Sequence, residues 1–231
     1  LAMMMTLSKR LVEADRHART GQPIDRAQYI GRELNGRTLG VIGIGNVGGN
    51  LTRICKAAFN MRVLAYDPLL SAEQVAARGG EKVDLEELLS QSDYVSVHCP
   101  LTKQSRKMVG AAQFAKMKPD AYFITTARGF IHDEDALAEA LRGRQIAGAG
   151  LDVWEDEPPP HDHPLMAFDN VIVSPHVAGS TVEARENMGR IAAEQVLDIL
   201  DGRKPPRLIN PEVWPAYRDR FARIMGFAPD D

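Results

Sequence analysis

A glycine pattern set between a strand-like run and a helix-like run constrains this chain more than any other feature. Residues 38–42 (TLGVI) are mostly apolar, and Gly43, Gly45 and Gly48 follow in the spacing GxGxxG. Residues 51–59 then carry apolar side chains at helical intervals. In such a strand–turn–helix the first glycine permits a tight turn, the second lets a pyrophosphate approach, and the third allows helix and strand to pack closely. The spacing alone also occurs in ordinary turns, but this context predicts a dinucleotide-binding unit.

Asp67 adds a second element of the same prediction. It ends the strand-like run at residues 62–66, about 20 residues after the glycines, where an acid typically binds the adenosine ribose. A solvated strand end is the plainer alternative. The next residues, Pro68, Leu69 and Leu70, offer no cation for a 2′-phosphate. We therefore expect NAD in preference to NADP.

Composition narrows the class of protein. The 231 residues carry a net charge of −3, which argues against a nucleic-acid surface as the main function. The sequence has no apolar run long enough to cross a bilayer and no secretory signal pattern. Cys55 and Cys99 lie in apolar patterns and are interpreted as small buried residues in a reducing compartment. We therefore expect a cytoplasmic protein.

Strand-like and helix-like runs alternate through the middle of the chain. Strands are expected at residues 38–42, 62–67, 82–83, 94–98, 121–125, 146–153 and 171–174. Helices are expected at residues 51–59, 71–77, 84–89, 111–117 and 133–142. This alternation predicts an α/β fold with a doubly wound parallel sheet, the Rossmann nucleotide-binding architecture.

Amphipathic segments flank the predicted sheet. Residues 1–21 form an expected helix with an apolar stripe, and residues 181–231 form a long helix followed by an arm that contains Trp214. Residues 22–180 then form the NAD-binding domain. We expect both flanking segments to cross to a substrate domain, most of which would precede Leu1. Left uncovered, the opening stripe and the Trp214 arm are expected to promote self-association.

Chemically distinctive side chains follow the predicted strands. Because ligands bind at the carboxyl ends of parallel strands, we expect these side chains to share one edge of the sheet. His176 is the candidate for moving a proton, since histidine titrates near neutral pH. Arg128 is expected to hold a substrate carboxylate. Glu157 would orient His176 and favour its charged form if the loop after Val153 folds back.

Each of these residues also has an interpretation that involves no catalysis. Arg128 could form an ordinary surface ion pair, and His176 could be structural. In the intervening loop, Glu155 and Asp156 are interpreted as solvated acidic residues. The His-Asp-His run at residues 161–163 has no convincing third ligand, so we expect no metal site.

Five ordered motifs resemble the D-isomer-specific 2-hydroxyacid dehydrogenase family, from Leu1 to about residue 211. They are GIGNVG (43–48) with Asp67-Pro68, VHCPLT (97–102), TARG (126–129), LDVWEDEP (151–158) and SPHVAG (174–179). The resemblance implies catalytic roles for Arg128, Glu157 and His176. It also implies cofactor contacts at Asn46, Val47, Asp67, Cys99, Thr126, Asp152 and Gly179. To these we add Pro100 and Ala127 from the same motifs, together with Gly43, Gly45 and Gly48.

The resemblance implies hydride transfer between NAD(H) and a D-2-hydroxy acid or its 2-oxo acid. The substrate would resemble 3-phosphoglycerate or hydroxypyruvate. Separately, we expect a homodimer that binds neither nucleic acid nor membrane. This chain alone is expected to bind NAD but to turn over poorly. Thr125 stands where the family more often has asparagine, which puts a local hydrogen bond in question.

Two rival functions remain open on these residues. One is a corepressor-type protein that senses NAD(H), since such proteins can retain the Arg128, Glu157 and His176 set. The other is an inactive structural remnant. Turnover with a panel of 2-oxo acids separates both from a dehydrogenase.

Overall fold

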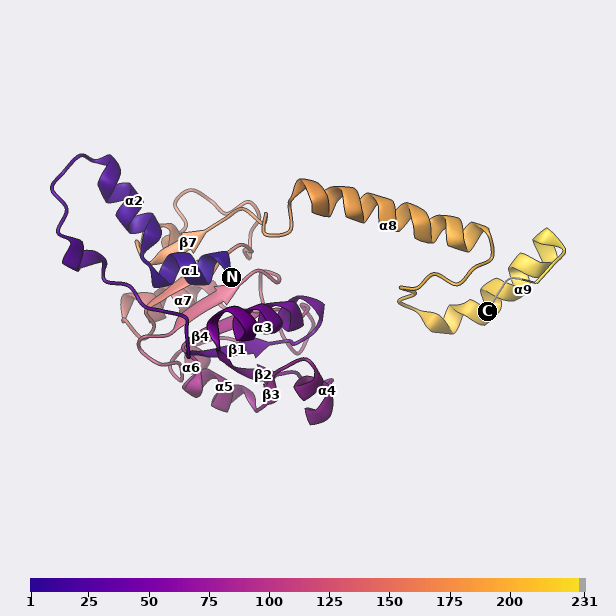
Figure 1. The fold of residues 1–231 in the computed structure, drawn as a ribbon, viewed down its shortest axis with the longest axis horizontal. Coiled ribbons are helices and arrows are strands. Elements are labelled where there is room, and N and C mark those ends of the chain that lie inside the picture. Colours follow the sequence, from indigo (N-terminus) through magenta and orange to yellow (C-terminus); the bar gives the residue numbers. More distant parts are fainter. Residues whose placement is uncertain (229–231) are drawn as a thin grey trace. The chain divides into compact units, whose positions relative to one another are not determined.

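Seven parallel strands form one sheet within the described part of the chain, residues 1–228 of this computed structural model (Figure 1). They are β1 (Thr38–Ile42), β2 (Arg62–Tyr66), β3 (Glu81–Lys82), β4 (Tyr94–Val97), β5 (Tyr122–Thr125), β6 (Gly148–Leu151) and β7 (Val171–Val173). Their order in the sheet is β3-β2-β1-β4-β5-β6-β7. The connections therefore run outward from β1 on one side and from β4 on the other. This order confirms the doubly wound α/β fold. The switch point, where such sheets bind nucleotides, lies at the carboxyl ends of the neighbouring strands β1 and β4.

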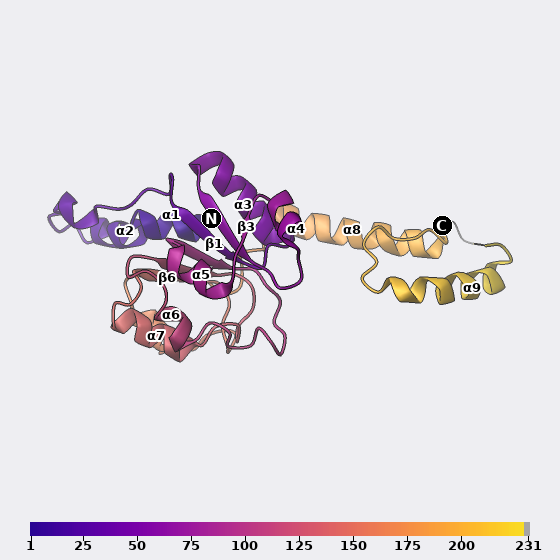
Figure 2. The same ribbon diagram turned by 90° about the horizontal axis from the view of Figure 1, so that it is seen from below.

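Helices cover both faces of this sheet (Figure 2). One face carries α1 (Ala2–Ser8), α3 (Asn46–Phe59) and α4 (Ala72–Ala77), and the other carries α5 (Leu85–Gln91), α6 (Ala111–Phe114) and α7 (Glu134–Arg142). Successive strand residues point to opposite faces. In β1, Leu39 and Val41 accordingly belong to the hydrophobic core under α1, α3 and α4. Ile42 belongs to the core under α5, α6 and α7.

Side-chain caps explain where several helices begin. Asp84, Asp133 and Thr181 each accept a hydrogen bond from the backbone N–H three residues further on. Ser71 forms a reciprocal capping box with Gln74. These caps satisfy backbone donors that a helix start leaves free. The helix starts predicted at these four positions are confirmed.

The opening segment differs from its prediction. It forms two helices, because Arg10 takes a left-handed backbone conformation (φ 49°) between α1 and α2 (Leu11–Arg19). α1 packs against the β5–β7 side of the sheet and buries Met4 and Leu7. The expectation that the whole apolar stripe lacks a partner is therefore wrong for α1. On α2, Leu11 is 58% exposed.

The chain divides into two compact units, residues 1–178 and the segment from Gly179 onward. The second unit contains α8 (Val182–Leu200), a short 3-10 turn (Pro211–Val213) and α9 (Trp214–Met225). The segment predicted as an arm is thus largely helical. Trp214 and Phe221 are buried, and the Tyr217 hydroxyl donates a hydrogen bond to the Ile199 carbonyl.

Two further 3-10 turns, Arg26–Tyr29 and Pro164–Ala167, lie in the first unit.

None of the helices in residues 1–228 is both long and apolar enough to span a membrane.

Candidate active site

The glycine turn after β1 has the close contacts that its spacing predicts. Gly43 has a φ of +89°, and a Cβ built on it would lie 2.7 Å from the backbone nitrogen of Cys99. A Cβ on Gly48 would lie 2.2 Å from the Gly43 carbonyl oxygen. Neither distance is tolerable for a real side chain. The tight turn at Gly43 and the close helix–strand packing at Gly48 are therefore confirmed.

Gly45 differs from these two glycines because the space around it is open. A Cβ at this position would meet no atom within 4 Å. Gly45 is also the N-cap of α3, and no side chain caps this helix start, in contrast to α4, α5, α7 and α8. The N–H groups of the first turn of α3 are thus left for an anion. This arrangement fits the pyrophosphate of a dinucleotide.

Asp67 lies beside the same turn. Its Oδ2 accepts a hydrogen bond from the Ile44 N–H at 3.2 Å, and its Oδ1 accepts one from the Leu69 N–H at 3.1 Å. The carboxylate is half-buried at the end of β2. It therefore lies where an adenosine ribose next to the glycine turn could reach it.

A cleft of about 560 Å³ opens at the carboxyl ends of β4 and β5. It is lined by Val47, His98, Cys99, Pro100, Leu101, Thr126, Ala127 and Arg128. Five of the predicted cofactor residues therefore share one cleft with the predicted substrate-binding arginine. Burial lowers the pKa of His98 to about 4, and its Nε2 lies 2.9 Å from the Ser96 hydroxyl. His98 therefore lines the cleft as a neutral imidazole at neutral pH.

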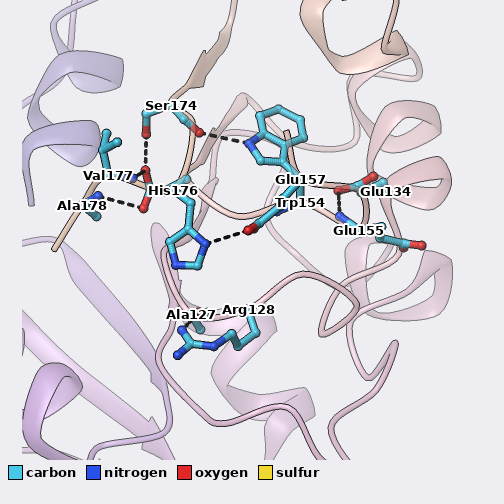
Figure 3. A network of polar contacts seen from close by, with 11 residues as sticks. Ala127, Arg128, Glu134, Trp154, Glu155, Glu157, Ser174, His176, Val177 and Ala178 are labelled. Atoms are coloured by element: carbon cyan, nitrogen blue, oxygen red, sulfur yellow. Dashed lines mark hydrogen bonds and ion pairs between the residues drawn. The ribbon is translucent and has the colours of Figure 1, made fainter. Parts of the chain in front are cut away.

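His176 and Glu157 form a direct pair (Figure 3). Nδ1 of His176 lies 2.8 Å from Oε2 of Glu157, so the loop after Val153 does fold back. The other oxygen of Glu157 accepts the Trp154 N–H at 3.1 Å. The hydrogen bond from His176 lowers the pKa of Glu157, with further lowering from the Trp154 N–H and the charge of Arg128. Glu157 is therefore an ionised carboxylate at neutral pH.

Arg128 uses little of its hydrogen-bonding capacity within the described residues. It is exposed at the end of β5, and its guanidinium donates a hydrogen bond of 2.5 Å to the Ala127 carbonyl. Among residues 1–228 no carboxylate pairs with it within 4 Å. The surface ion pair considered above is not seen. The guanidinium is thus available for a substrate carboxylate.

The turn that carries His176 is strained and held by a buried acid. His176 has a left-handed backbone (φ 56°), which costs about 1–3 kcal/mol for such a residue. The buried carboxylate of Asp152 accepts hydrogen bonds from the Ser174 hydroxyl at 2.6 Å and from the N–H groups of Val177 and Ala178 at 2.8 and 2.9 Å. These bonds offset the strain. That Asp152 also contacts the cofactor stays a prediction.

Other predicted residues meet different surroundings. Thr125, where a local hydrogen bond is in question, is buried, and its hydroxyl has no hydrogen-bond partner in the described part of the chain. Gly179 begins the second unit, so its cofactor contact stays a prediction.

The acidic loop is only partly solvated. Asp156 is exposed, as expected. The prediction is wrong for Glu155, whose side chain is 20% exposed and lies 3.3 Å from the Lys107 ammonium. His163 bonds to Glu134 at 3.0 Å. Within residues 1–228 we find no group of three or more His, Cys, Asp or Glu side chains that could hold a metal ion.

The parallel sheet, the glycine turn at its switch point and the acid at the end of β2 define a Rossmann dinucleotide-binding domain with a histidine–carboxylate pair. Residues 1–178 match the family model described as D-isomer specific 2-hydroxyacid dehydrogenase, NAD binding domain. The chain belongs to this family, and the cofactor of the domain is NAD.

Individual proteins agree with the family model. The chain is 42% identical over 217 residues to a D-3-phosphoglycerate dehydrogenase of Archaeoglobus fulgidus, covering 94% of this chain and 41% of that protein. It is 41% identical over 217 residues to a glyoxylate reductase of Thermofilum pendens, covering 92% and 64%. The crystal structure of D-lactate dehydrogenase with NAD⁺ from Lactobacillus jensenii matches with a TM-score of 0.80 and 32% identity, covering 90% and 66%. The chain thus spans between two fifths and two thirds of the length of these relatives.

Proposed function

We propose that the protein transfers hydride between NAD(H) and a D-2-hydroxy acid or its 2-oxo acid. The observation that carries this proposal is the 2.8 Å contact between His176 and Glu157. It joins a proton-carrying group to an ionised carboxylate, and the charge of Arg128 reaches the same pair. Relatives named as D-3-phosphoglycerate dehydrogenase and glyoxylate reductase support the reaction class and suggest 3-phosphoglycerate or glyoxylate as substrates, in addition to the hydroxypyruvate that the motif resemblance implies.

Each of the three side chains has a distinct part in this proposal. Arg128 binds the substrate carboxylate and polarises the neighbouring carbonyl. Nδ1 of His176 faces Glu157, so Nε2 is the nitrogen that gives a proton to the carbonyl oxygen during reduction and takes it back during oxidation. Glu157 fixes the ring orientation and stabilises the charged imidazolium. NADH, when bound, supplies the hydride that reaches the carbonyl carbon.

The same proposal assigns the cofactor contacts. The first turn of α3 at Gly45, Asn46 and Val47 would bind the pyrophosphate. Asp67 would bind the adenosine ribose. The cleft that contains Cys99, Pro100, Thr126 and Ala127 would hold the rest of the dinucleotide.

We also propose that the protein works as a cytoplasmic homodimer without nucleic acid. Residues 1–21 and 181–231 would cross to a substrate domain that closes over the cofactor. Both cysteines are free thiols and the net charge is −3, which supports these assignments.

Steady-state NADH oxidation tests the proposal. The protein, produced with any residues that precede Leu1 in its gene, is assayed with glyoxylate, hydroxypyruvate, 3-phosphohydroxypyruvate and pyruvate. We expect turnover with at least one of them and a loss of roughly a hundredfold or more in His176→Ala. His161→Ala, an exposed histidine of the neighbouring loop, is the matched control. NADH binding without turnover of any 2-oxo acid would favour the sensor function instead.

A further inference from the structure

The peptide that joins Trp154 to Glu155 is fixed from both sides. On one side, a Cβ on Gly129 would lie 1.8 Å from the Trp154 carbonyl oxygen, so the two backbones touch. On the other side, the Glu155 N–H donates a hydrogen bond of 2.8 Å to Oε1 of Glu134. The N–H of Trp154 belongs to the preceding peptide, which shares the Trp154 Cα, and it donates a hydrogen bond of 3.1 Å to Oε1 of Glu157. A movement of this peptide would therefore move the carboxylate that faces His176.

Glu134 uses both of its carboxylate oxygens inside the protein. It is the first residue of α7, and only 9% of it is exposed. Its Oε2 lies 3.0 Å from Nε2 of His163, while Nδ1 of His163 accepts the Leu165 N–H at 3.2 Å. His163 must therefore carry its proton on Nε2, and this N–H donates a hydrogen bond to Glu134. Burial raises the pKa of Glu134, and the hydrogen bonds from the Glu155 N–H and His163 lower it by a smaller amount, so the pKa stays above its usual value.

We propose that Glu134 is a positioning residue for the acid/base pair, supported by His163. Figure 3 shows Glu134 beside the Glu155 backbone, with Glu157 between it and His176 in this view. Glu134 fixes the Trp154–Glu155 peptide, and the adjacent Val153–Trp154 peptide holds Glu157 through the Trp154 N–H. The inference rests on the proposed function, because it gives Glu157 and His176 their roles. Glu134 itself touches neither of them.

Neighbouring charges hold the same loop by a separate contact. The Glu155 side chain pairs with Lys107, which also pairs with Asp133 at 3.0 Å. This contact acts on a side chain, whereas Glu134 acts on the backbone. The groups whose charges reach the Glu157 carboxylate are His176 and Arg128.

Glu134→Gln tests the inference because glutamine cannot accept both hydrogen bonds. Its amide nitrogen would face either the Glu155 N–H or the Nε2–H of His163, and two donors would then oppose each other. The Trp154–Glu155 peptide must shift in response. We expect the bond between Glu157 and His176 to loosen and the imidazolium to be less well stabilised.

The experiment follows the ring resonances of His176 by NMR across pH in the full chain with labelled histidine. We expect the midpoint of the titration to fall by about half a pH unit or more in Glu134→Gln, toward its value in Glu157→Gln. Glu139→Gln, an exposed position on the same helix, is the matched control and should leave the midpoint unchanged. His163→Gln gives a second, milder variant and should shift the midpoint in the same direction.

The outcomes separate the inference from its alternatives. A lower unfolding temperature in Glu134→Gln with an unchanged His176 midpoint would overturn the positioning role and leave a structural one. An unchanged midpoint in Glu157→Gln would overturn it as well, because the pair itself would then have no effect. The His176 midpoint can be measured without turnover, so the positioning role can be tested even if no 2-oxo acid is reduced. A lack of reduction would count against the proposed function alone.

Discussion

Nδ1 of His176 lies 2.8 Å from Oε2 of Glu157, although 19 residues separate them in the chain. The two side chains come from different connections, the loop after β6 and the turn after β7. Buried carboxylates hold both: Asp152 accepts the N–H groups that follow His176, and Glu134 accepts the N–H of Glu155. The pair is thus exposed to a ligand, while its supports lie inside the protein.

Glu157→Gln should change the pH dependence of reduction. The lowered pKa of Glu157 keeps it charged at neutral pH, so its removal takes a stabilising negative charge from the imidazolium. In the reductive direction the reaction needs the protonated ring, so kcat/KM should begin to fall at a lower pH than in the parent protein. NADH affinity should stay the same. Asp156→Asn, an exposed neighbour, is the control. A superimposable pH–rate profile in Glu157→Gln would remove this residue from the mechanism.

Gly45→Ala should separate cofactor binding from folding. The new methyl group meets no atom of the protein within 4 Å, so stability should change little. It would, however, stand at the N-terminus of α3, where we place the pyrophosphate. We expect NADH affinity, measured by fluorescence titration, to fall about tenfold or more, or about 1.4 kcal/mol. Gly189→Ala on α8 is equally open and should bind NADH normally. Equal affinities in the two variants would place the pyrophosphate elsewhere.

Asp67 should make the protein prefer NADH over NADPH by at least about tenfold, or about 1.4 kcal/mol. Its carboxylate would accept the ribose hydroxyls and repel a 2′-phosphate. Asp67→Asn keeps the size of the side chain and removes the charge, so the preference should shrink. Parallel titrations with both cofactors check this. NADPH binding as tight as NADH binding in the parent protein would contradict the assignment.

His132 should make the fold sensitive to acid. The ring is fully buried against Phe123, neither nitrogen has a hydrogen-bond partner in the described chain, and burial lowers its pKa to about 4. As pH falls from about 6.5 toward 4, His132 binds a proton in the unfolded chain but stays neutral in the folded chain. The free energy of unfolding therefore decreases over this range, by about 3 kcal/mol at most.

His132→Leu removes this proton linkage together with two unpartnered polar atoms. Urea unfolding should show a smaller loss of stability between pH 7.5 and pH 5, and a stability at pH 7.5 that is equal or about 1–3 kcal/mol higher. His161→Leu, at an exposed histidine, should leave both quantities unchanged. An undiminished pH dependence in His132→Leu would show that the ring finds a partner.

Local signals predicted most of the fold because they act over a few residues. The glycines at 43 and 48 are required by contacts below 3 Å, and caps such as Asp84 and Asp133 mark helix starts three residues from their donors. The left-handed break at Arg10 carries no such signal, since it is neither glycine nor asparagine. The helix at residues 214–225 lies in the segment predicted only as an arm, because the prolines at 205, 206 and 211 interrupt any helical pattern before it.

The site shows the same limit. His176, Arg128 and Glu157 were predictable because they follow strands or lie in a loop between two of them. Glu134 and His163 are 29 residues apart, and each lies in an ordinary helical or polar context. Their contact depends on how α7 and the loop after β6 pack, which spacing alone does not reveal. Glu134 lies in the first turn of α7, where acidic residues are common, so its position carries no distinct signal of this contact.

Deuterium transfer is the most direct test of the central claim. The protein, with any residues that precede Leu1 in its gene, is mixed with NADH deuterated at both C4 positions and with glyoxylate, hydroxypyruvate, 3-phosphohydroxypyruvate or pyruvate. The products are then analysed by mass spectrometry. We predict one deuterium on C2 of a 2-hydroxy acid, of D configuration wherever C2 of the unlabelled acid is a stereocentre, and almost none with His176→Ala. Bound NADH that transfers no deuterium to any of these acids would contradict the account.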